Sequence, residues 1–152
     1  MAVFDGVQLG ANGGPKLFND FFAFEQTLRN GIFVAAGDVN GDGFADLVAG
    51  GGPGGGPRVF ILDGKSLVQN GPATLVPVGN FFAGDVNNRG GIRVAVKKLD
   101  NDNKADVVTG AGTGAGSKVT AYLGKDTTPN GTPPTVLDFD AFAGFGGGVF
   151  VG

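Results

Sequence analysis

Apolar residues occur along this chain in short runs that are separated by glycine, asparagine, aspartate and proline. β-Branched and aromatic side chains dominate the runs. No stretch sustains apolar positions at the 3.6-residue period of an amphipathic helix. Short runs bounded by turn-forming residues are typical of β-strands joined by tight turns. The pattern therefore predicts an all-β protein.

The runs repeat at a constant offset of 60 residues, which indicates an internal repeat. Gly31–Ala35 recurs as Gly91–Ala95, and Asn40–Asp46 recurs as Asp100–Asp106. Each copy contains four runs of strand character. The predicted strands cover residues 31–37, 46–50, 58–63 and 74–82 in the first copy and residues 91–97, 106–110, 118–123 and 135–142 in the second.

Between the third and fourth strand of each copy lies a stretch rich in proline, asparagine, glycine and threonine. These stretches, residues 64–73 and 124–135, are predicted to be exposed loops. The chain then divides into two complete four-stranded units and two incomplete ends. The predicted boundaries are 1–30 for a partial unit, 31–90 and 91–146 for the complete units, and 147–152 for the first strand of a further unit.

The N-terminal segment can be aligned with the complete units in two ways. In the first, residues 7–18 correspond to a second strand, a glycine turn and a third strand. In the second, Met1–Gly6 corresponds to Arg58–Gly64, which leaves residues 7–17 as a loop. Under either alignment, this end lacks a first strand, whereas the C-terminal end offers one.

The segment Asp38–Asp46 has the side-chain spacing of a calcium loop. Oxygen-bearing side chains stand at relative positions 1, 3, 5 and 9, and Gly43 at position 6 suits a sharp turn. Calcium prefers six to eight oxygen ligands, and one short loop can supply most of them. The predicted ligands are Asp38, Asn40, Asp42 and Asp46, with the backbone carbonyl of Phe44 at position 7.

Two alternative interpretations of this loop differ in what they require. A helix-loop-helix calcium site needs a glutamate at position 12, where Ala49 stands, and its flanks would be helical. A turn rich in aspartate, asparagine and glycine could also form without binding a metal. The number of acids at ligand spacing favours a calcium loop that joins two strands.

Composition narrows the possible functions. Histidine, cysteine and tryptophan are absent, Glu25 is the only glutamate and Tyr122 the only tyrosine. The chain therefore lacks a thiol nucleophile and the commonest general base, and we predict that it is not an enzyme. The net charge of −3, with scattered lysines and arginines, gives no nucleic-acid-binding patch. Neither a signal peptide nor a run of about 18 apolar residues for a membrane span is present.

The loop Asp38–Asp46, the following Val48–Pro53 and the Phe-Gly pair at 145–146 resemble the FG-GAP (VCBS) repeat. The resemblance extends over nearly the whole chain. It implies four-stranded antiparallel blades of an integrin-α-type β-propeller, about 2.5–3 of them in this chain, and an extracellular or cell-surface location. It also implies that Asp38, Asn40, Asp42, Asp46 and the Phe44 carbonyl bind Ca²⁺.

The second copy of the loop departs from this pattern. Lys98 replaces the first aspartate and Asn103 replaces the glycine, whereas Asp100, Asp102 and Asp106 remain. An added cation and a lost carboxylate weaken Ca²⁺ binding. We expect the ammonium of Lys98 to occupy the ion position next to the three acids, and Asn103 to adopt the left-handed conformation of Gly43.

Three blade equivalents are too few for a closed ring, because propellers have four to eight. The segment Gly148–Val151 matches the first strand of both complete units, so it could pair with the N-terminal unit of another copy. We therefore predict a calcium-binding structural or adhesion module that forms homo-oligomers head to tail, as a six-bladed ring of two chains or as a filament. The alternatives are a lectin-like ligand-binding propeller and a fragment of a longer extracellular repeat protein.

Overall fold

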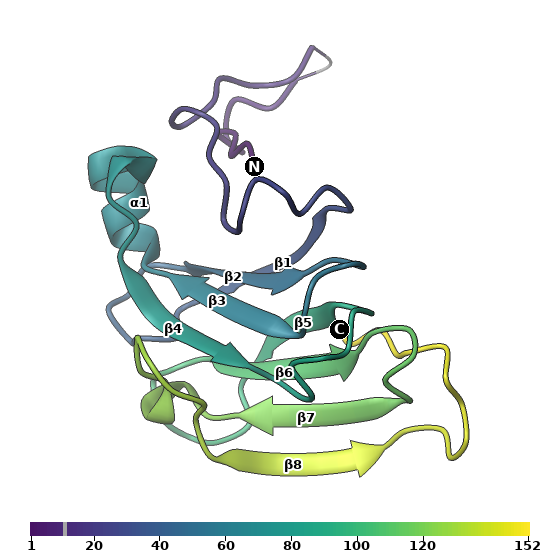
Figure 1. Cartoon of the computed structure of the whole chain (residues 1–152). Coiled ribbons are helices and arrows are strands. Elements are labelled where there is room, and N and C mark those ends of the chain that lie inside the picture. Colours follow the sequence, from purple (N-terminus) through teal and green to yellow (C-terminus); the bar gives the residue numbers. More distant parts are fainter. Residues whose placement is uncertain (11) are drawn as a thin grey trace.

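The computed structural model describes residues 1–10 and 12–152 and contains two four-stranded antiparallel sheets, which confirms the predicted all-β fold class (Figure 1). The strands of each sheet are hydrogen-bonded in sequence order. The first sheet consists of β1 (Ile32–Gly37), β2 (Asp46–Gly51), β3 (Arg58–Leu62) and β4 (Pro77–Phe82). The second consists of β5 (Ile92–Lys97), β6 (Asp106–Ala111), β7 (Lys118–Tyr122) and β8 (Thr135–Asp140).

The two sheets repeat each other in register as well as in order. Gly37 pairs with Asp46 across β1 and β2, and Lys97 pairs with Asp106 across β5 and β6. Both sheets carry a register shift at the same place, next to Leu62 in β3 and next to Tyr122 in β7. The 60-residue sequence repeat is therefore also a structural repeat.

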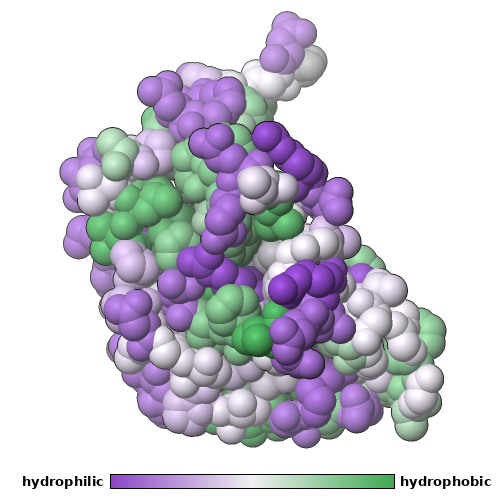
Figure 2. All heavy atoms as spheres, in the orientation of Figure 1, coloured by the Kyte–Doolittle hydropathy of each residue, from purple (hydrophilic) through white to green (hydrophobic). Residues whose placement is uncertain are grey.

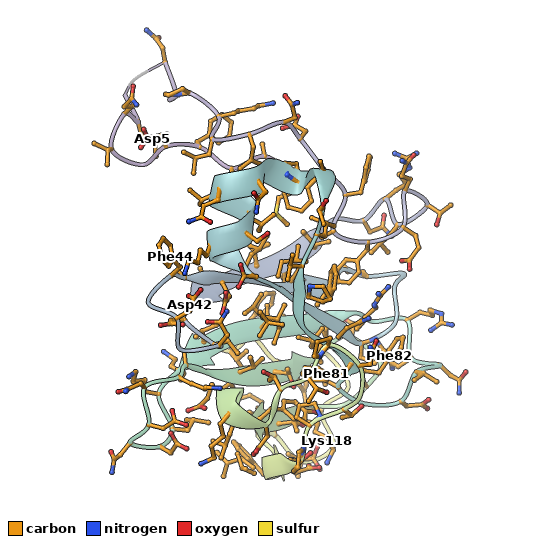
Figure 3. The ribbon with its side chains drawn as sticks, turned by 90° about the vertical axis from the view of Figure 1, so that its left-hand side faces the viewer. Asp5, Asp42, Phe44, Phe81, Phe82 and Lys118 are labelled. Atoms are coloured by element: carbon orange, nitrogen blue, oxygen red, sulfur yellow. The ribbon has the colours of Figure 1, made fainter. Side chains whose placement is uncertain are left out.

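The main core lies between the sheets. Phe81 in β4 and Tyr122 in β7 meet with ring centroids 4.8 Å apart, and Figure 3 shows Phe81 in this interior position. The buried side chains of this core come from both sheets: Val48, Val59, Ile61 and Phe81 from the first, and Ile92, Val94, Val107 and Tyr122 from the second. Burial of branched and aromatic side chains on one face of each sheet supplies the apolar area that holds the two together.

Close approach of β5 to β2 requires a glycine at position 50. A Cβ atom at Gly50 would overlap the carbonyl oxygen of Ile92. The same contact recurs at the next junction, where a Cβ atom at Gly110 would overlap the carbonyl oxygen of Val149. The C-terminal segment therefore lies on the second sheet as β5 lies on the first. It forms no strand of a sheet, although the amide of Val149 donates to the carbonyl of Ala111 at 3.0 Å.

The N-terminal segment covers the opposite face of the first sheet, away from the second (Figure 1). Phe4 pairs with Lys16, and the amide of Leu17 donates to the carbonyl of Val3 at 2.9 Å. The amide of Phe21 also donates to the carbonyl of Met1 at 3.1 Å, so the first residues of the chain lie antiparallel to residues 15–21. A second apolar cluster lies beneath them, with buried Phe21, Ala23, Phe24, Ala49, Leu62 and Leu67.

The prediction of an exposed loop after β3 is wrong for residues 64–70. These residues form the helix α1 (Gly64–Asn70), followed by the short 3₁₀ turn η1 (Gly71–Ala73). Asp63 caps the helix, because its carboxylate accepts a hydrogen bond from the amide of Ser66 at 2.6 Å. Leu67 packs into the second cluster. In the second unit, the corresponding stretch contains only the 3₁₀ turn η2 (Gly124–Asp126).

Large apolar side chains remain on the surface of the molecule. Figure 2 shows apolar residues in several separate patches between polar ones. The most exposed phenylalanines lie at or after β8, with Phe142 at 60% and Phe150 at 74%. Within residues 1–10 and 12–152, no helix has the length and apolar character needed to cross a membrane.

Candidate metal centre

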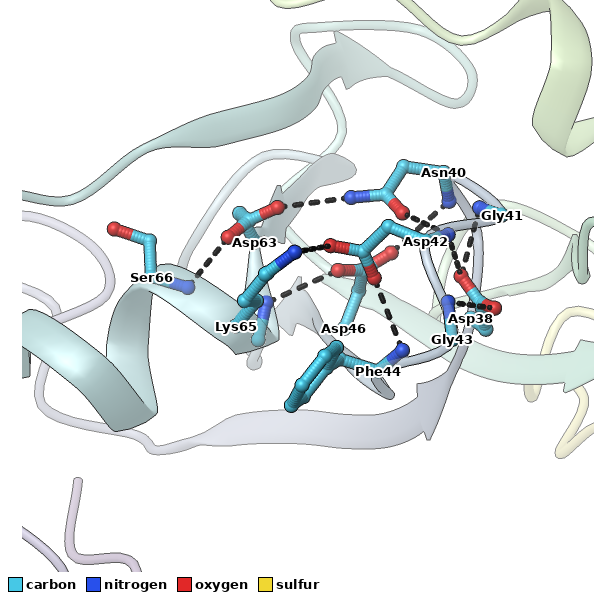
Figure 4. A network of polar contacts seen from close by, with 11 residues as sticks. Asp38, Asn40, Gly41, Asp42, Gly43, Phe44, Asp46, Asp63, Lys65 and Ser66 are labelled. Carbon is cyan, nitrogen blue, oxygen red and sulfur yellow. Dashed lines mark hydrogen bonds and ion pairs between the residues drawn. The ribbon is translucent and has the colours of Figure 1, made fainter.

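The loop between β1 and β2 is organised by the side chain of Asp38 (Figure 4). Its Oδ1 accepts hydrogen bonds from the amides of Gly41 at 2.7 Å and Asp42 at 3.0 Å, and its Oδ2 accepts one from Gly43 at 2.8 Å. Gly41 and Gly43 have φ angles of 81° and 86°, in the left-handed region that other residues avoid. The sharp turn predicted at Gly43 is therefore present.

Asn40 and Asp42 continue this network. Asn40 Oδ1 accepts from the amide of Asp42 at 2.9 Å, and Asn40 Nδ2 donates to Asp63 Oδ2 at 2.8 Å. Asp42 Oδ1 accepts from the amide of Phe44 at 3.0 Å. The bond to Asp63 ties the loop to the residue that caps α1, so the loop, β3 and α1 form one unit.

Asp46 has a different position from the other three candidate ligands. It is fully buried at the start of β2. Its Oδ2 accepts from the amides of Val39 at 2.9 Å and Asn40 at 3.1 Å, and its Oδ1 accepts from the amide of Gly64 at 3.0 Å. Burial raises the pKa of this carboxyl group, while the bonds from the three amides act in the opposite direction. Asp46 therefore connects the loop to the first residue of α1.

Asp106 makes the same connection in the second unit. It is fully buried, and it accepts from the amide of Leu99 at 2.6 Å and from the amide of Gly124 at 2.9 Å. The second loop is not predicted to bind metal, yet it keeps this carboxylate in the same role. The position-9 aspartate thus has a structural function in both units.

The donor atoms of the loop decide whether it suits Ca²⁺. Within the described residues, no group of three or more His, Cys, Asp and Glu side chains is placed to hold a metal ion. The oxygens of Asp38, Asn40, Asp42 and Asp46 accept hydrogen bonds from amides instead. An ionised carboxylate has about four acceptor positions, so each of these acids retains lone pairs. All donors are hard oxygens, and in chemical type they fit Ca²⁺.

A lysine that sequence analysis missed stands beside the loop. Lys65 in α1 has its Nζ 4.0 Å from Asp42 Oδ2 and 5.2 Å from the centroid of the Phe44 ring. Figure 3 places Asp42 and Phe44 together on this loop. The available signal was the repeat itself, since Lys125 lies 60 residues after Lys65.

In the second loop, Lys125 rather than Lys98 neutralises the acids. Its Nζ contacts Asp100 Oδ2 at 2.8 Å, which lowers the pKa of Asp100 and raises that of Lys125. Lys98 instead donates to the backbone carbonyl of Asp102 at 3.3 Å. The expectation that Lys98 contacts the three acids is therefore wrong. Lys98 stands at the position of Asp38 in the first loop, but a lysine side chain cannot accept hydrogen bonds from the loop amides as Asp38 does.

The expected left-handed conformation at Asn103 is also absent. Among the described residues, only glycines have positive φ angles. The second loop thus differs in backbone shape from the first, in which Gly41 and Gly43 both take that conformation. Its buried Asp102 Oδ2 has no hydrogen-bond partner in the described part of the chain.

The fold and the loop together define a class of protein. Two four-stranded antiparallel sheets stacked face to face, with the first strand of one lying on the preceding sheet, are propeller-type blades that do not close into a ring. The family model of the FG-GAP repeat matches residues 30–62, which include β1, the loop, β2 and β3, in agreement with the resemblance seen in the sequence. The chain has no match among curated proteins or among solved structures.

FG-GAP repeats typically occur in extracellular proteins, as adhesion-type or structural modules. The family is generally non-enzymatic.

Proposed function

We propose that the protein is a calcium-binding structural or adhesion module that acts outside the cell or at its surface. The observation that carries this proposal is the loop Asp38–Asp46, whose oxygen donors stand at calcium-ligand spacing within a segment that matches the FG-GAP repeat. Asp38, Asn40, Asp42, Asp46 and the Phe44 carbonyl would hold the ion. A bound Ca²⁺ would supply positive charge and fix the geometry of these oxygens.

The charge of the loop explains why a cation would stabilise this unit. Asp38, Asp42, Asp46 and Asp63 belong to one connected network, and Asp63 contributes to the raised pKa of Asp46. Lys65 is the one cation within ion-pair distance of this network in the described chain, and its Nζ is 4.0 Å from Asp42. The amides that donate to these carboxylates offset part of their mutual repulsion, and a divalent ion would remove more of it.

The first test is calorimetric titration with Ca²⁺, combined with thermal unfolding. With the affinity typical of extracellular modules, a dissociation constant of roughly 10⁻⁴–10⁻³ M is expected. At about 1 mM Ca²⁺, this affinity contributes about 0.4–1.4 kcal/mol to stability. Asp42→Ala should abolish most of the Ca²⁺-dependent rise in Tm. Asp85→Ala, at an exposed turn outside the loop, is the control and should keep it. A full Ca²⁺ response in Asp42→Ala would refute this site.

We further propose that copies of the chain associate head to tail through their ends. The segment Gly148–Val151 lies on the second sheet, and Phe150 is 74% exposed there. In the N-terminal segment, Phe22 is 56% exposed, and Phe4 forms an isolated antiparallel bridge with Lys16. Extended segments with unpaired backbone groups and apolar side chains are suited to β-augmentation. The association would give a ring if its rotation closes and a filament if it does not.

Solution mass with and without Ca²⁺ tests this association. The chain should form dimers or larger assemblies, and deletion of residues 147–152 should leave a monomer of lower stability. If the truncated chain keeps the mass of the parent, the C-terminal segment is not the contact. If the parent is a monomer in both conditions, the chain does not self-associate.

A further inference from the structure

Three residues at the same position of the repeat meet on one side of the molecule. They are Phe33 in β1, Arg93 in β5 and Phe150 in the C-terminal segment, each preceded and followed by valine or isoleucine. The rings of Phe33 and Phe150 are 6.0 Å apart and nearly perpendicular, at 80°. The guanidinium carbon of Arg93 lies 5.5 Å from the centroid of Phe33 and 4.5 Å from that of Phe150. Both distances are within cation–π range.

Arg93 is an unusual cation because it is buried without an acid. It is only 8% exposed, and none of the ion pairs among the described residues includes it. Its Nη1 donates to the carbonyl of Ala111 at 2.7 Å, and its buried Nε has no hydrogen-bond partner among residues 1–10 and 12–152. Burying a charge without a counter-ion is costly. In this structure, the rings of Phe33 and Phe150 offset part of the cost of burying the Arg93 charge through cation–π contacts.

The backbone of the C-terminal segment packs closely against this guanidinium at Gly148. Gly148 has a φ of 78°, and a Cβ atom there would overlap Arg93 Nη1. The carbonyl of Ala111, which accepts from Arg93, also accepts from the amide of Val149 at 3.0 Å. The Ala111 carbonyl at the end of β6 therefore binds both Arg93 and the C-terminal segment that Arg93 contacts.

We propose that Phe33 and Arg93 form an open docking slot for an extended segment with phenylalanine at its third position, and that Phe150, which remains 74% exposed, contacts this slot with one side of its ring. The occupant is the Gly148–Val151 segment of this chain. An aromatic ring in the slot is attracted to the guanidinium, whereas a cation there is repelled. The slot would thus accept Gly-Val-Phe-Val and reject a segment such as Gly91–Val94, which carries arginine at this position.

The test is a double-mutant cycle on Arg93 and Phe150, in which the exchange rate of the Val149 amide is measured. Hydrogen exchange of the Val149 amide, followed by NMR, reports how long the segment stays docked. Arg93→Met, which keeps an apolar side chain of similar length, should speed this exchange about fivefold, and so should Phe150→Leu. The double variant should be little faster than either single variant, because each removes the same interaction. Phe150→Tyr should retain the protection of the parent.

The controls separate the slot from general stability and from self-association. Arg89→Met removes an exposed arginine nearby and should leave Val149 exchange unchanged. The amide of Val48 in β2 should stay protected in every variant. If Arg93→Met disturbs folding, Arg93→Gln, which keeps a hydrogen-bond donor but removes the charge, replaces it in the cycle. Exchange that is unaffected by Arg93→Met or Arg93→Gln, or effects that simply add in the double variant, would overturn the proposal. Solution mass is measured separately. A monomeric protein with strong coupling between Arg93 and Phe150 would support the docking slot and contradict the proposed head-to-tail association.

Discussion

Asp46→Ala is expected to lower the free energy of unfolding by about 3–5 kcal/mol, because it leaves two buried amides and one partly buried amide without an acceptor. Those amides belong to Val39, Asn40 and Gly64, so both the loop and the start of α1 lose their anchor. The effect should be seen in Ca²⁺-free buffer, since the three bonds do not require a metal. Urea-induced unfolding measures it directly.

Asp42→Ala is the matched control for this prediction. Asp42 lies in the same loop, is exposed and accepts a hydrogen bond from the amide of Phe44. Its replacement should cost about 1 kcal/mol or less without Ca²⁺. Equal losses in the two variants would show that Asp46 has no special structural role.

Gly50→Ala is expected to destabilise the contact between the sheets by about 2–4 kcal/mol. The added methyl group would meet the carbonyl oxygen of Ile92 and would lie 3.0 Å from Val94 Cγ1. Both atoms belong to β5, which must move away from β2 and expose part of the main core. Chemical denaturation, together with exchange of amides in β5, measures this separation.

Gly146→Ala is the control for this second substitution. An added methyl group at Gly146 would meet no atom within 4 Å, and the backbone there has no positive φ. Its effect should stay within about 0.5 kcal/mol. A loss in Gly50→Ala no larger than that of Gly146→Ala would contradict the close approach of β5 to β2.

The strands were predictable because their signals are local. Apolar runs bounded by glycine and aspartate predicted all eight strands, and each predicted range overlaps the observed one, as for 46–50 and Asp46–Gly51. Helix α1 was missed because its seven residues are too few to display a helical period. Its available signal was Asp63, a residue type preferred at the N-cap of a helix.

The candidate site was predictable only within the loop. The spacing of Asp38, Asn40 and Asp42 indicated a tight turn, and the structure shows their side chains holding that turn. Asp63 and Lys65 follow β3 in the chain. They reach the loop only because Leu62 at the end of β3 pairs with Leu47 near the start of β2, so their contacts with the loop depend on the folded sheet. Lys125 likewise reaches the second loop only in the folded structure. It contacts Asp100, whereas Lys98 donates to the backbone carbonyl of Asp102. Binding of Ca²⁺ itself remains a prediction.

The paired roles of Asp46 and Asp106 have a consequence for how such proteins diversify. In each unit, one buried carboxylate secures the architecture of the blade, while positions 1, 3 and 5 of the loop provide the remaining oxygens that would hold the ion. Changes at those three positions, such as Lys98 in the second unit, can therefore alter ion binding without dismantling the blade. If the first loop binds Ca²⁺ as proposed, an array of these units would vary in the number of ions it carries, and hence in its sensitivity to the surrounding calcium concentration, while the sheets of each unit stay the same.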